Sequence, residues 1–201
     1  MNPSSLPELA GLSSEPVARR NLEPSHCALL VVDLQEKLMP AIARRDQVVR
    51  NCQILIRLAG ILHIPVLLST QYVRGLGPTV PEIAGLLESV PPIDKMSFGC
   101  FGSEEFCSAL RRLPGHRTTA LLCGIEAHIC VMQTALGALQ NGYMVHVAAD
   151  AVGSRSEQNY ELGLQRMASA GCVLSSTEMM MYELLRRSGT AEFKEMLSYI
   201  K

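Results

Sequence analysis

The sequence lacks the features that mark several common classes of protein. It contains no tryptophan, only 4% aromatic and 18% charged residues, and its formal net charge is −1. Because it has no basic run, we expect no nucleic-acid partner. No apolar run approaches the roughly 20 residues that span a bilayer, and no charged start leads into an apolar secretory segment. We therefore expect a cytoplasmic protein without a membrane partner.

The cysteines also exclude several architectures. There are seven of them, an odd number, spread widely and without a C-x-x-C pair. A disulfide scaffold or a structural zinc site would need closer pairing, and the cysteines have no zinc-ligand spacing to the histidines. We expect free thiols in a reducing compartment, and neither a metal nor a cofactor.

What is present suits a single folded domain. Hydrophobic residues make up 48% of the 201 residues, enough for a substantial core. Residues 1–24 hold four prolines and several serines with no sustained apolar period. We predict that residues 1–24 form an N-terminal arm and that residues 25–201 form the domain.

Within the domain, apolar runs of strand length alternate with stretches of helical spacing. The predicted strands are 27–32, 65–70, a short one ending near 95, 118–123, 143–149 and 172–175. The predicted helices are 46–62, a weak one near 82–88, 103–112, 129–141, 156–170, 177–187 and 191–200. This alternation requires right-handed crossovers and a parallel sheet covered on both faces. The fold class is therefore α/β, a doubly wound, Rossmann-like domain of about six strands.

Polar residues follow the ends of these strands. They are Asp33, Gln71, Lys95, Cys130 and Asp150. Since ligands of such sheets bind beyond the carboxyl ends of the strands, we expect these side chains to share one edge. Each also has a plain structural interpretation: an aspartate can cap a helix, and a lysine on a loop can simply be solvated.

Cys130 has the most suggestive position, in the first turn of a helix after a strand and a glycine-opened turn. Unpaired N–H groups and the helix dipole favour a thiolate there, and the same N–H groups can hold an oxyanion. The alternative is a buried core cysteine. His128, two residues earlier, is a weaker candidate for a catalytic base.

Three segments, 31–35, 94–101 and 124–131, resemble the motifs of the isochorismatase-like (cysteine hydrolase) family. They read Val31-Val32-Asp33-Leu34-Gln35, Asp94-Lys95-x-x-Phe98-x-x-Phe101 and Gly124-Ile125-Glu126-Ala127-His128-Ile129-Cys130-Val131. The resemblance covers about residues 25–185 and has the motifs in the family's order.

The resemblance implies a three-layer α/β/α sandwich with a mostly parallel six-stranded sheet. It maps the family's catalytic triad onto Asp33, Lys95 and Cys130. It also implies a cis peptide between Ile125 and Glu126, and an oxyanion hole formed by the backbone N–H groups of Glu126 and Cys130.

Two departures from family members narrow the subclass. Enzymes of the family that cleave isochorismate typically carry glycine where this chain has Cys130. Nicotinamidases carry an Asp-x-His metal motif after the second strand, where this chain reads Ser69-Thr70-Gln71-Tyr72-Val73. The chain therefore resembles the metal-free branch.

The implied activity is nucleophilic attack by Cys130 on a small amide or related acyl group, through a thioester intermediate. Asp33 would take the thiol proton, and Lys95 would favour the thiolate. Hydrolysis and transfer to another acceptor both stay open, as does a non-catalytic member that binds a metabolite or a protein. We expect a small-molecule substrate and a homo-oligomer. The residues expected to contact substrate, which could equally cap strands or pack in the core, are Gln35, Gln71, Tyr72, Phe98, Phe101 and Ile125.

Overall fold

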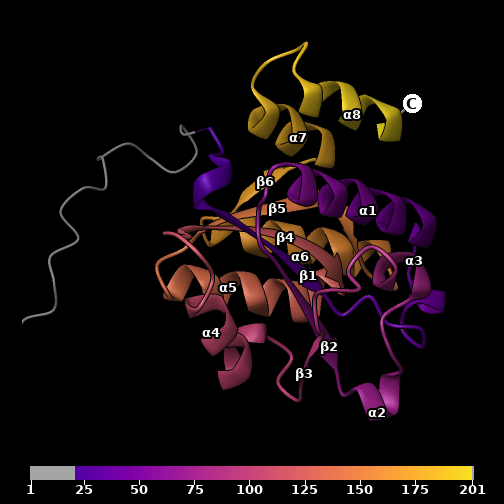
Figure 1. Cartoon of the computed structure of the whole chain (residues 1–201). Helices are drawn as coiled ribbons and strands as arrows, with labels where there is room; N and C mark the ends of the chain where they lie inside the picture. The colour runs from indigo at the N-terminus through magenta and orange to yellow at the C-terminus, as the bar shows by residue number, and fades with distance from the viewer. Residues whose placement is uncertain (1–20, 201) are drawn as a thin grey trace, which may run out of the picture.

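A computed structural model describes residues 21–200; most of the predicted arm, residues 1–20, lies outside them. The domain is built on one six-stranded sheet in the order β3-β2-β1-β4-β5-β6, and every neighbouring pair is parallel (Figure 1). The strands are β1 (Cys27–Val32), β2 (Val66–Gln71), β3 (Ile93–Lys95), β4 (Thr119–Ile125), β5 (Met144–Gly153) and β6 (Val173–Ser175). The predicted α/β fold class is confirmed.

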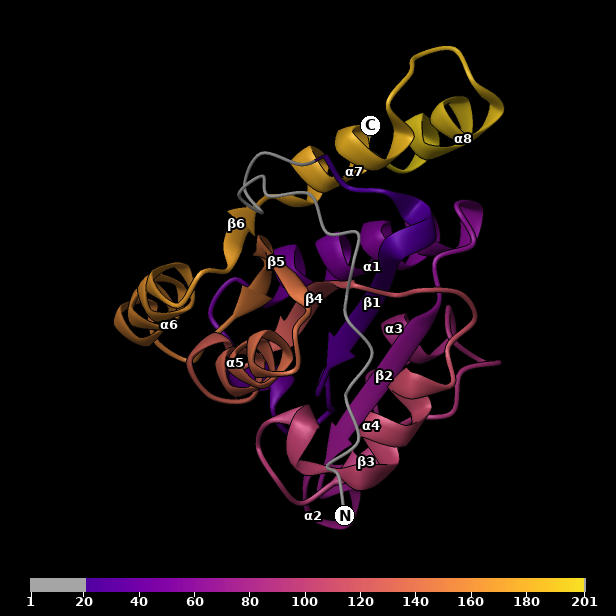
Figure 2. The same ribbon diagram turned by 90° about the vertical axis from the view of Figure 1, so that its left-hand side faces the viewer.

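Residues 21–200 form eight α-helices, which lie between or after the strands, and helices pack on both faces of the sheet (Figure 2). They are α1 (Arg45–Ile61), α2 (Val73–Leu76), α3 (Pro81–Ala84), α4 (Glu104–Arg111), α5 (Met132–Gln140), α6 (Glu157–Ser169), α7 (Thr177–Leu185) and α8 (Ala191–Ile200). Short 3-10 turns lie at Pro24–His26, Met39–Ala41 and Cys100–Gly102, and a π-helical turn, η5, at Ala127–Val131.

The strand period of two separates the core into two clusters. In β1, Leu29 and Val31 face a cluster shared with α1, α3, α7 and α8. Ala28, Leu30 and Val32 face the second cluster, shared with α4, α5 and α6. Successive strand residues point to opposite faces, so a strand buried on both faces is apolar throughout. Each buried leucine contributes about 1.5–3 kcal/mol.

Three helices begin at serine caps. The hydroxyls of Ser103, Ser156 and Ser176 accept hydrogen bonds from backbone N–H groups three residues later, at the starts of α4, α6 and α7. Such caps satisfy donors that the first helical turn leaves unpaired. Thr177, where the predicted helix 177–187 begins, is the first residue of α7.

Asp150 is the residue that the strand-end prediction placed wrongly. It lies inside β5, which continues to Gly153, and its carboxylate accepts hydrogen bonds from the N–H and hydroxyl of Thr177 at 2.7 and 2.9 Å. The prediction ended this strand at residue 149. Asp150 thus fixes the start of α7 and is no part of the polar edge.

The strand order identifies the switch point of the sheet. From β1 the chain builds outward through β2 to β3, then returns to place β4 on the other side of β1. The crevice between β1 and β4, beyond their carboxyl ends, is where such sheets bind ligands. Asp33 follows β1 and Cys130 follows β4, so both lie at this point.

Candidate active site

A buried ion pair occupies the edge of the sheet at the switch point. Lys95 Nζ lies 2.7 Å from Asp33 Oδ2, and both side chains are 0% exposed. Asp33 has a positive φ of 51°, which aspartate tolerates better than most residues and which turns the chain sharply at the end of β1. Removing one partner of such a pair leaves an uncompensated buried charge and lowers the stability of the folded protein by about 3–5 kcal/mol.

Neighbouring polar groups satisfy both charges. Ser69 Oγ donates to Asp33 Oδ1 at 2.7 Å, while Lys95 Nζ also donates to Gln71 Oε1 at 3.0 Å and to the Phe98 carbonyl at 2.9 Å. Ser69 and Gln71 are two residues apart in β2 and therefore share a face. Charge-assisted bonds of this kind hold Lys95 in one position.

Cys130 completes this cluster, with only 6% of its surface exposed on the π-helical turn η5. Its thiol has a pKa raised well above the ordinary value, chiefly by burial and then by the charge of Asp33. Lys95 lowers this pKa, as predicted, but its effect is outweighed. The thiol is therefore protonated at rest, whereas the sequence had suggested a ready-made thiolate.

Gly124 allows β4 to pass close to β1 before it turns toward Cys130. Its φ is +120°, and a Cβ at this position would lie 2.1 Å from the Val32 carbonyl oxygen. Only glycine fits such a contact. One residue further on, the peptide between Ile125 and Glu126 is cis, as the family resemblance implied.

The turn that carries Cys130 is also held from the side of β5. The buried Glu126 carboxylate accepts hydrogen bonds from the Arg155 backbone N–H at 2.9 Å and from Arg155 Nε at 3.1 Å. His128 Nδ1 lies 3.0 Å from Ser154 Oγ. Nothing in this geometry brings His128 to the thiol as a base, since its ring is engaged by the β5–α6 loop.

Three of the residues predicted to contact substrate are engaged in hydrogen bonds or in packing within the protein. Gln35 is fully buried, and its amide donates to the carbonyls of Gln71 and Gly77 and accepts from the Gln71 N–H. Phe101 packs its ring against those of Phe106 and Tyr143. Ile125 is completely buried in the first core cluster.

Tyr72 and Phe98 remain at the rim. Tyr72 is 44% exposed after β2, and Phe98 is 55% exposed three residues after Lys95. Gln71 is buried but reaches the site, since its amide bridges Lys95 and the Met96 carbonyl.

Sequence reasoning missed Ser69 and Arg155. Ser69 could have been found from strand periodicity, because it lies two residues before Gln71 on the same face of β2. Arg155 follows the true end of β5, which the prediction placed four residues too early, so nothing in the sequence pointed to it.

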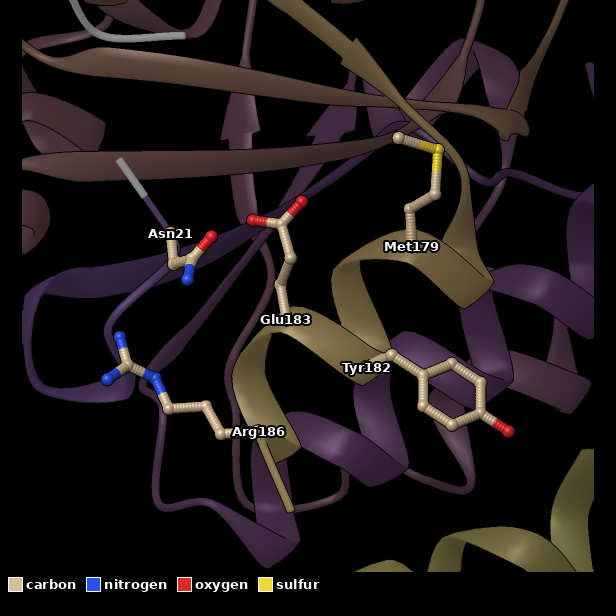
Figure 3. A pocket seen from close by; sticks show the side chains of 5 residues that line it. All are labelled: Asn21, Met179, Tyr182, Glu183 and Arg186. Carbon is tan, nitrogen blue, oxygen red and sulfur yellow. The ribbon is translucent and has the colours of Figure 1, made fainter. Parts of the chain in front are cut away.

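Two hollows on the surface of residues 21–200 lie away from this site. One of about 450 Å³ borders α7 and is lined by Asn21, Met179, Tyr182, Glu183 and Arg186 (Figure 3). The other, of about 350 Å³, lies among α1, α7 and α8. Neither is lined by Asp33, Lys95 or Cys130, so neither belongs to the site at the switch point.

Residues 21–200 offer no site for a metal ion, since no three His, Cys, Asp or Glu side chains converge there. Within the same residues, no helix has both the length and the apolar character that a membrane crossing needs. All seven cysteines are free thiols.

The fold and the buried cluster define the class first: a doubly wound α/β protein with a polar site at its switch point. The Isochorismatase domain family matches residues 27–179. A secreted isochorismatase effector, Isc1, of Phytophthora sojae is 36% identical, covering 96% of this chain and 93% of that protein. Isochorismatase domain-containing protein 2 of Danio rerio is 40% identical, with 83% of each chain covered. The chain belongs to the isochorismatase family.

Solved structures share the fold. The MAR1 ribonuclease of Caenorhabditis elegans has a TM-score of 0.83 at 35% identity, covering 90% of this chain and 92% of that one. The YcaC gene product of Escherichia coli, an octameric hydrolase of unknown specificity, has a TM-score of 0.82 at 26% identity, with 89% and 90% covered. YcaC from Pseudomonas aeruginosa, with hexane-2,5-diol and covalent acrylamide, has a TM-score of 0.83 at 25% identity, with 90% and 92% covered.

Proposed function

We propose that this chain is a cysteine hydrolase that cleaves the C–N bond of a small amide, or a related acyl bond. The observation that carries the proposal is the Asp33–Lys95 ion pair, completely buried beside the Cys130 thiol. Burying two charges is costly, and a stable fold does not require it. A reaction that moves a proton and forms an anion does require such groups.

In the first half of the reaction, Asp33 takes the proton of Cys130 as the sulfur attacks the carbonyl carbon. The carbonyl oxygen becomes an oxyanion, held by the backbone N–H groups of Glu126 and Cys130. The intermediate then collapses: the C–N bond breaks, Asp33 returns the proton to the leaving nitrogen, and an acyl thioester stays on Cys130.

In the second half, Asp33 takes a proton from water, which attacks the thioester carbon. The carboxylic acid leaves and the proton returns to the sulfur. When the proton moves from Cys130 to Asp33, the negative charge moves from the carboxylate to the sulfur. The Lys95 ammonium stabilises the charge in both positions and so lowers the free energy of the thiolate. One oxyanion donor contributes about 2.7–4 kcal/mol in comparable sites.

The raised thiol pKa fits this order of events. A thiol that is protonated at rest needs a base at the moment of attack, and Asp33 is the base in contact with it. The carboxylate thus raises the thiol pKa in the resting state and accepts its proton during the reaction.

Two relatives support the proposal. The E. coli YcaC protein is a hydrolase, and the P. aeruginosa YcaC structure contains covalent acrylamide, a small electrophilic amide. Acrylamide adds to a nucleophile through its carbon–carbon double bond, so by analogy Cys130 would be alkylated by acrylamide, as expected of a reactive thiol. Gln71, Tyr72 and Phe98 would contact the substrate at the rim.

We further propose a metal-free reaction, because the triad supplies both base and nucleophile. Turnover is expected to survive exhaustive treatment with EDTA; loss with EDTA and recovery with zinc or iron would contradict this.

The setting and the assembly are also proposals. Seven free thiols suit a reducing, cytoplasmic compartment. The octameric E. coli relative supports a homo-oligomer, which light scattering at micromolar concentration would test against a monomeric mass.

The test is a panel of small amides, with an RNA oligonucleotide included because one relative is named a ribonuclease. For any amide that is hydrolysed, Cys130→Ala is expected to abolish turnover with the melting temperature retained. Cys107→Ala, which removes a half-buried thiol on α4, is the matched control and should change nothing. An amide that Cys130→Ala still cleaves at the wild-type rate would contradict the proposal and leave the metabolite- or protein-binding alternative.

A further inference from the structure

Two consecutive residues of the β5–α6 loop hold the turn that leads to Cys130. Arg155 binds the carboxylate of Glu126 through its backbone N–H and its side-chain Nε, and Ser154 Oγ lies 3.0 Å from His128 Nδ1. The loop thus contacts two side chains of the turn, those of Glu126 and His128, on the side of β4 that faces β5.

The Glu126–Arg155 pair differs from the ordinary surface pairs of this protein. The Glu126 side chain is 8% exposed, while that of Arg155 is 61% exposed. In the pair between Arg111 and Glu104 on α4, the side chains are 61% and 83% exposed. Exposed pairs contribute little because water screens them, whereas a buried carboxylate depends on its donors. Arg155 therefore fixes the Glu126 side chain in one position.

The backbone of Glu126 is the part of the residue that the reaction needs. The Glu126 N–H donates no hydrogen bond to any of residues 21–200, and none of these residues competes with an oxyanion for it. An oxyanion donor acts only when it lies about 2.7–3.1 Å from the developing negative oxygen. Holding the side chain of a residue at a turn restricts the direction of its N–H, and displacements of about 1 Å can cost up to 100-fold in rate.

The loop has a rigid support on which to act. α6, which follows the loop directly, packs so closely against η5 that a Cβ on Gly163 would lie 2.9 Å from His128 Cα. A second tie joins Ser154 to the other side of the sheet, where its carbonyl accepts a hydrogen bond from the Ala43 N–H at 3.0 Å.

We propose that Arg155 is a positioning residue: through the Glu126 carboxylate it aims the Glu126 N–H at the oxyanion of the acyl-transfer transition state. This inference rests on the proposed function, since it assigns Arg155 a part in the acyl-transfer chemistry of Cys130. Arg155 touches neither the thiol nor the ion pair of Asp33 and Lys95, so its effect is confined to steps that form an oxyanion.

Two reagents separate these steps. p-Nitrophenyl acetate acylates a thiol through a tetrahedral oxyanion: the S–C bond forms and p-nitrophenolate leaves. Iodoacetamide alkylates the same thiol by direct displacement of iodide at carbon, without an oxyanion. The rate of each reaction at Cys130 is measured by peptide mapping, and their ratio reports the oxyanion hole independently of thiol ionisation.

Arg155→Ala is expected to lower the acylation rate at Cys130 at least about 10-fold while changing alkylation less than about 2-fold. Arg155→Lys should retain part of the acylation rate, since it keeps the charge and the backbone N–H but lacks the Nε donor. Glu126→Gln, which keeps the shape of the side chain, provides a second variant if Arg155→Ala melts early. Arg111→Ala, with an arginine of equal exposure, should leave both rates unchanged.

The inference is overturned if the Arg155 variants leave the ratio of the two rates unchanged, whether both rates stay constant or both fall together. A wild-type protein whose Cys130 reacts with neither reagent would instead contradict the proposed function itself.

Discussion

At the scale of single residues, Asp33 has two opposing effects on the proposed nucleophile. Its negative charge raises the pKa of the Cys130 thiol, and Lys95 lowers it by less. The same carboxylate is the base that the proposed mechanism assigns to the thiol. How readily the thiol ionises at rest and how fast it reacts in acyl transfer are therefore separate properties of this site.

Asp33→Asn is expected to move these two properties in opposite directions. Without the negative charge the thiol pKa falls, so iodoacetamide alkylation of Cys130 at pH 8 becomes faster than in the wild type. Amide turnover falls by orders of magnitude because the proton acceptor is gone. Asp46→Asn, which changes a carboxylate 94% exposed on α1, is the control. Slower alkylation in Asp33→Asn would show that the carboxylate favours the thiolate.

The sequence predicted part of this site. Motif and strand-end reasoning placed Asp33, Lys95 and Cys130 at one edge, and the structure brings them together. It did not predict the net sign of the Cys130 pKa shift, because burial depends on how the surrounding elements pack. Gln35 and Phe101 both belong to the family motifs. In the structure, Gln35 forms hydrogen bonds to backbone groups and Phe101 packs against two aromatic rings, and neither contact could be predicted from the sequence.

At the scale of elements, the C-terminal end of β4 determines the position of the proposed nucleophile, Cys130. The pairing of β4 with β5 shifts register between Leu122 and Gly124, and Gly124 presses against the Val32 carbonyl. η5 then begins at Ala127, two residues after the end of β4. Contacts between strands thus determine the path of this turn. Position 124 has no room for a side chain larger than that of glycine.

Gly124→Ala is expected to destabilise the protein by more than about 3 kcal/mol, because its Cβ would meet backbone and its φ suits only glycine. Gly60→Ala is the matched control on α1: a Cβ there meets nothing within 4 Å, and helix propensity should raise stability by about 0.5–1 kcal/mol. Urea unfolding measures the free energy of unfolding of both variants. Equal stability of Gly124→Ala and the wild type would contradict the close contact.

Element types were more predictable than their boundaries. β1 and α8 have the predicted bounds because a continuous apolar run and a helical period each end at clear breaks in the pattern. The helix predicted at 129–141 actually begins as the π-helical turn η5 and continues as α5 to Gln140. A hydrophobic period does not distinguish a π turn from an α turn over one or two residues.

At the scale of the whole molecule, six of the seven thiols are buried in the layers around the sheet. Burial raises the pKa of Cys27 to about 12, and those of Cys100 and Cys172 to about 11. In the unfolded chain these thiols ionise near their ordinary value of about 8.5. The folded state therefore holds protons that the unfolded state loses at alkaline pH.

The sign of the pH dependence follows. A raised folded pKa gives stability that is fully present below about pH 8 and is lost as the pH rises toward 11–12. At pH 10 each of these thiols lowers the free energy of unfolding by on the order of 1–2 kcal/mol relative to its value at pH 7.5. Urea midpoints at the two values test this. Cys172→Ala should show a smaller drop than the wild type, and equal midpoints at both pH values would contradict the account.

The central claim is that Cys130 becomes covalently acylated during turnover, and the most direct measurement is the mass of that residue in the working protein. An amide from the panel is mixed with the wild type, the reaction is quenched in acid within milliseconds to seconds, and the peptides are mapped. The account predicts a Cys130 peptide heavier by the acyl group, and increasing amounts of that species as the amide concentration approaches saturation. Turnover without any adduct on Cys130, or with the adduct on another residue, would contradict it.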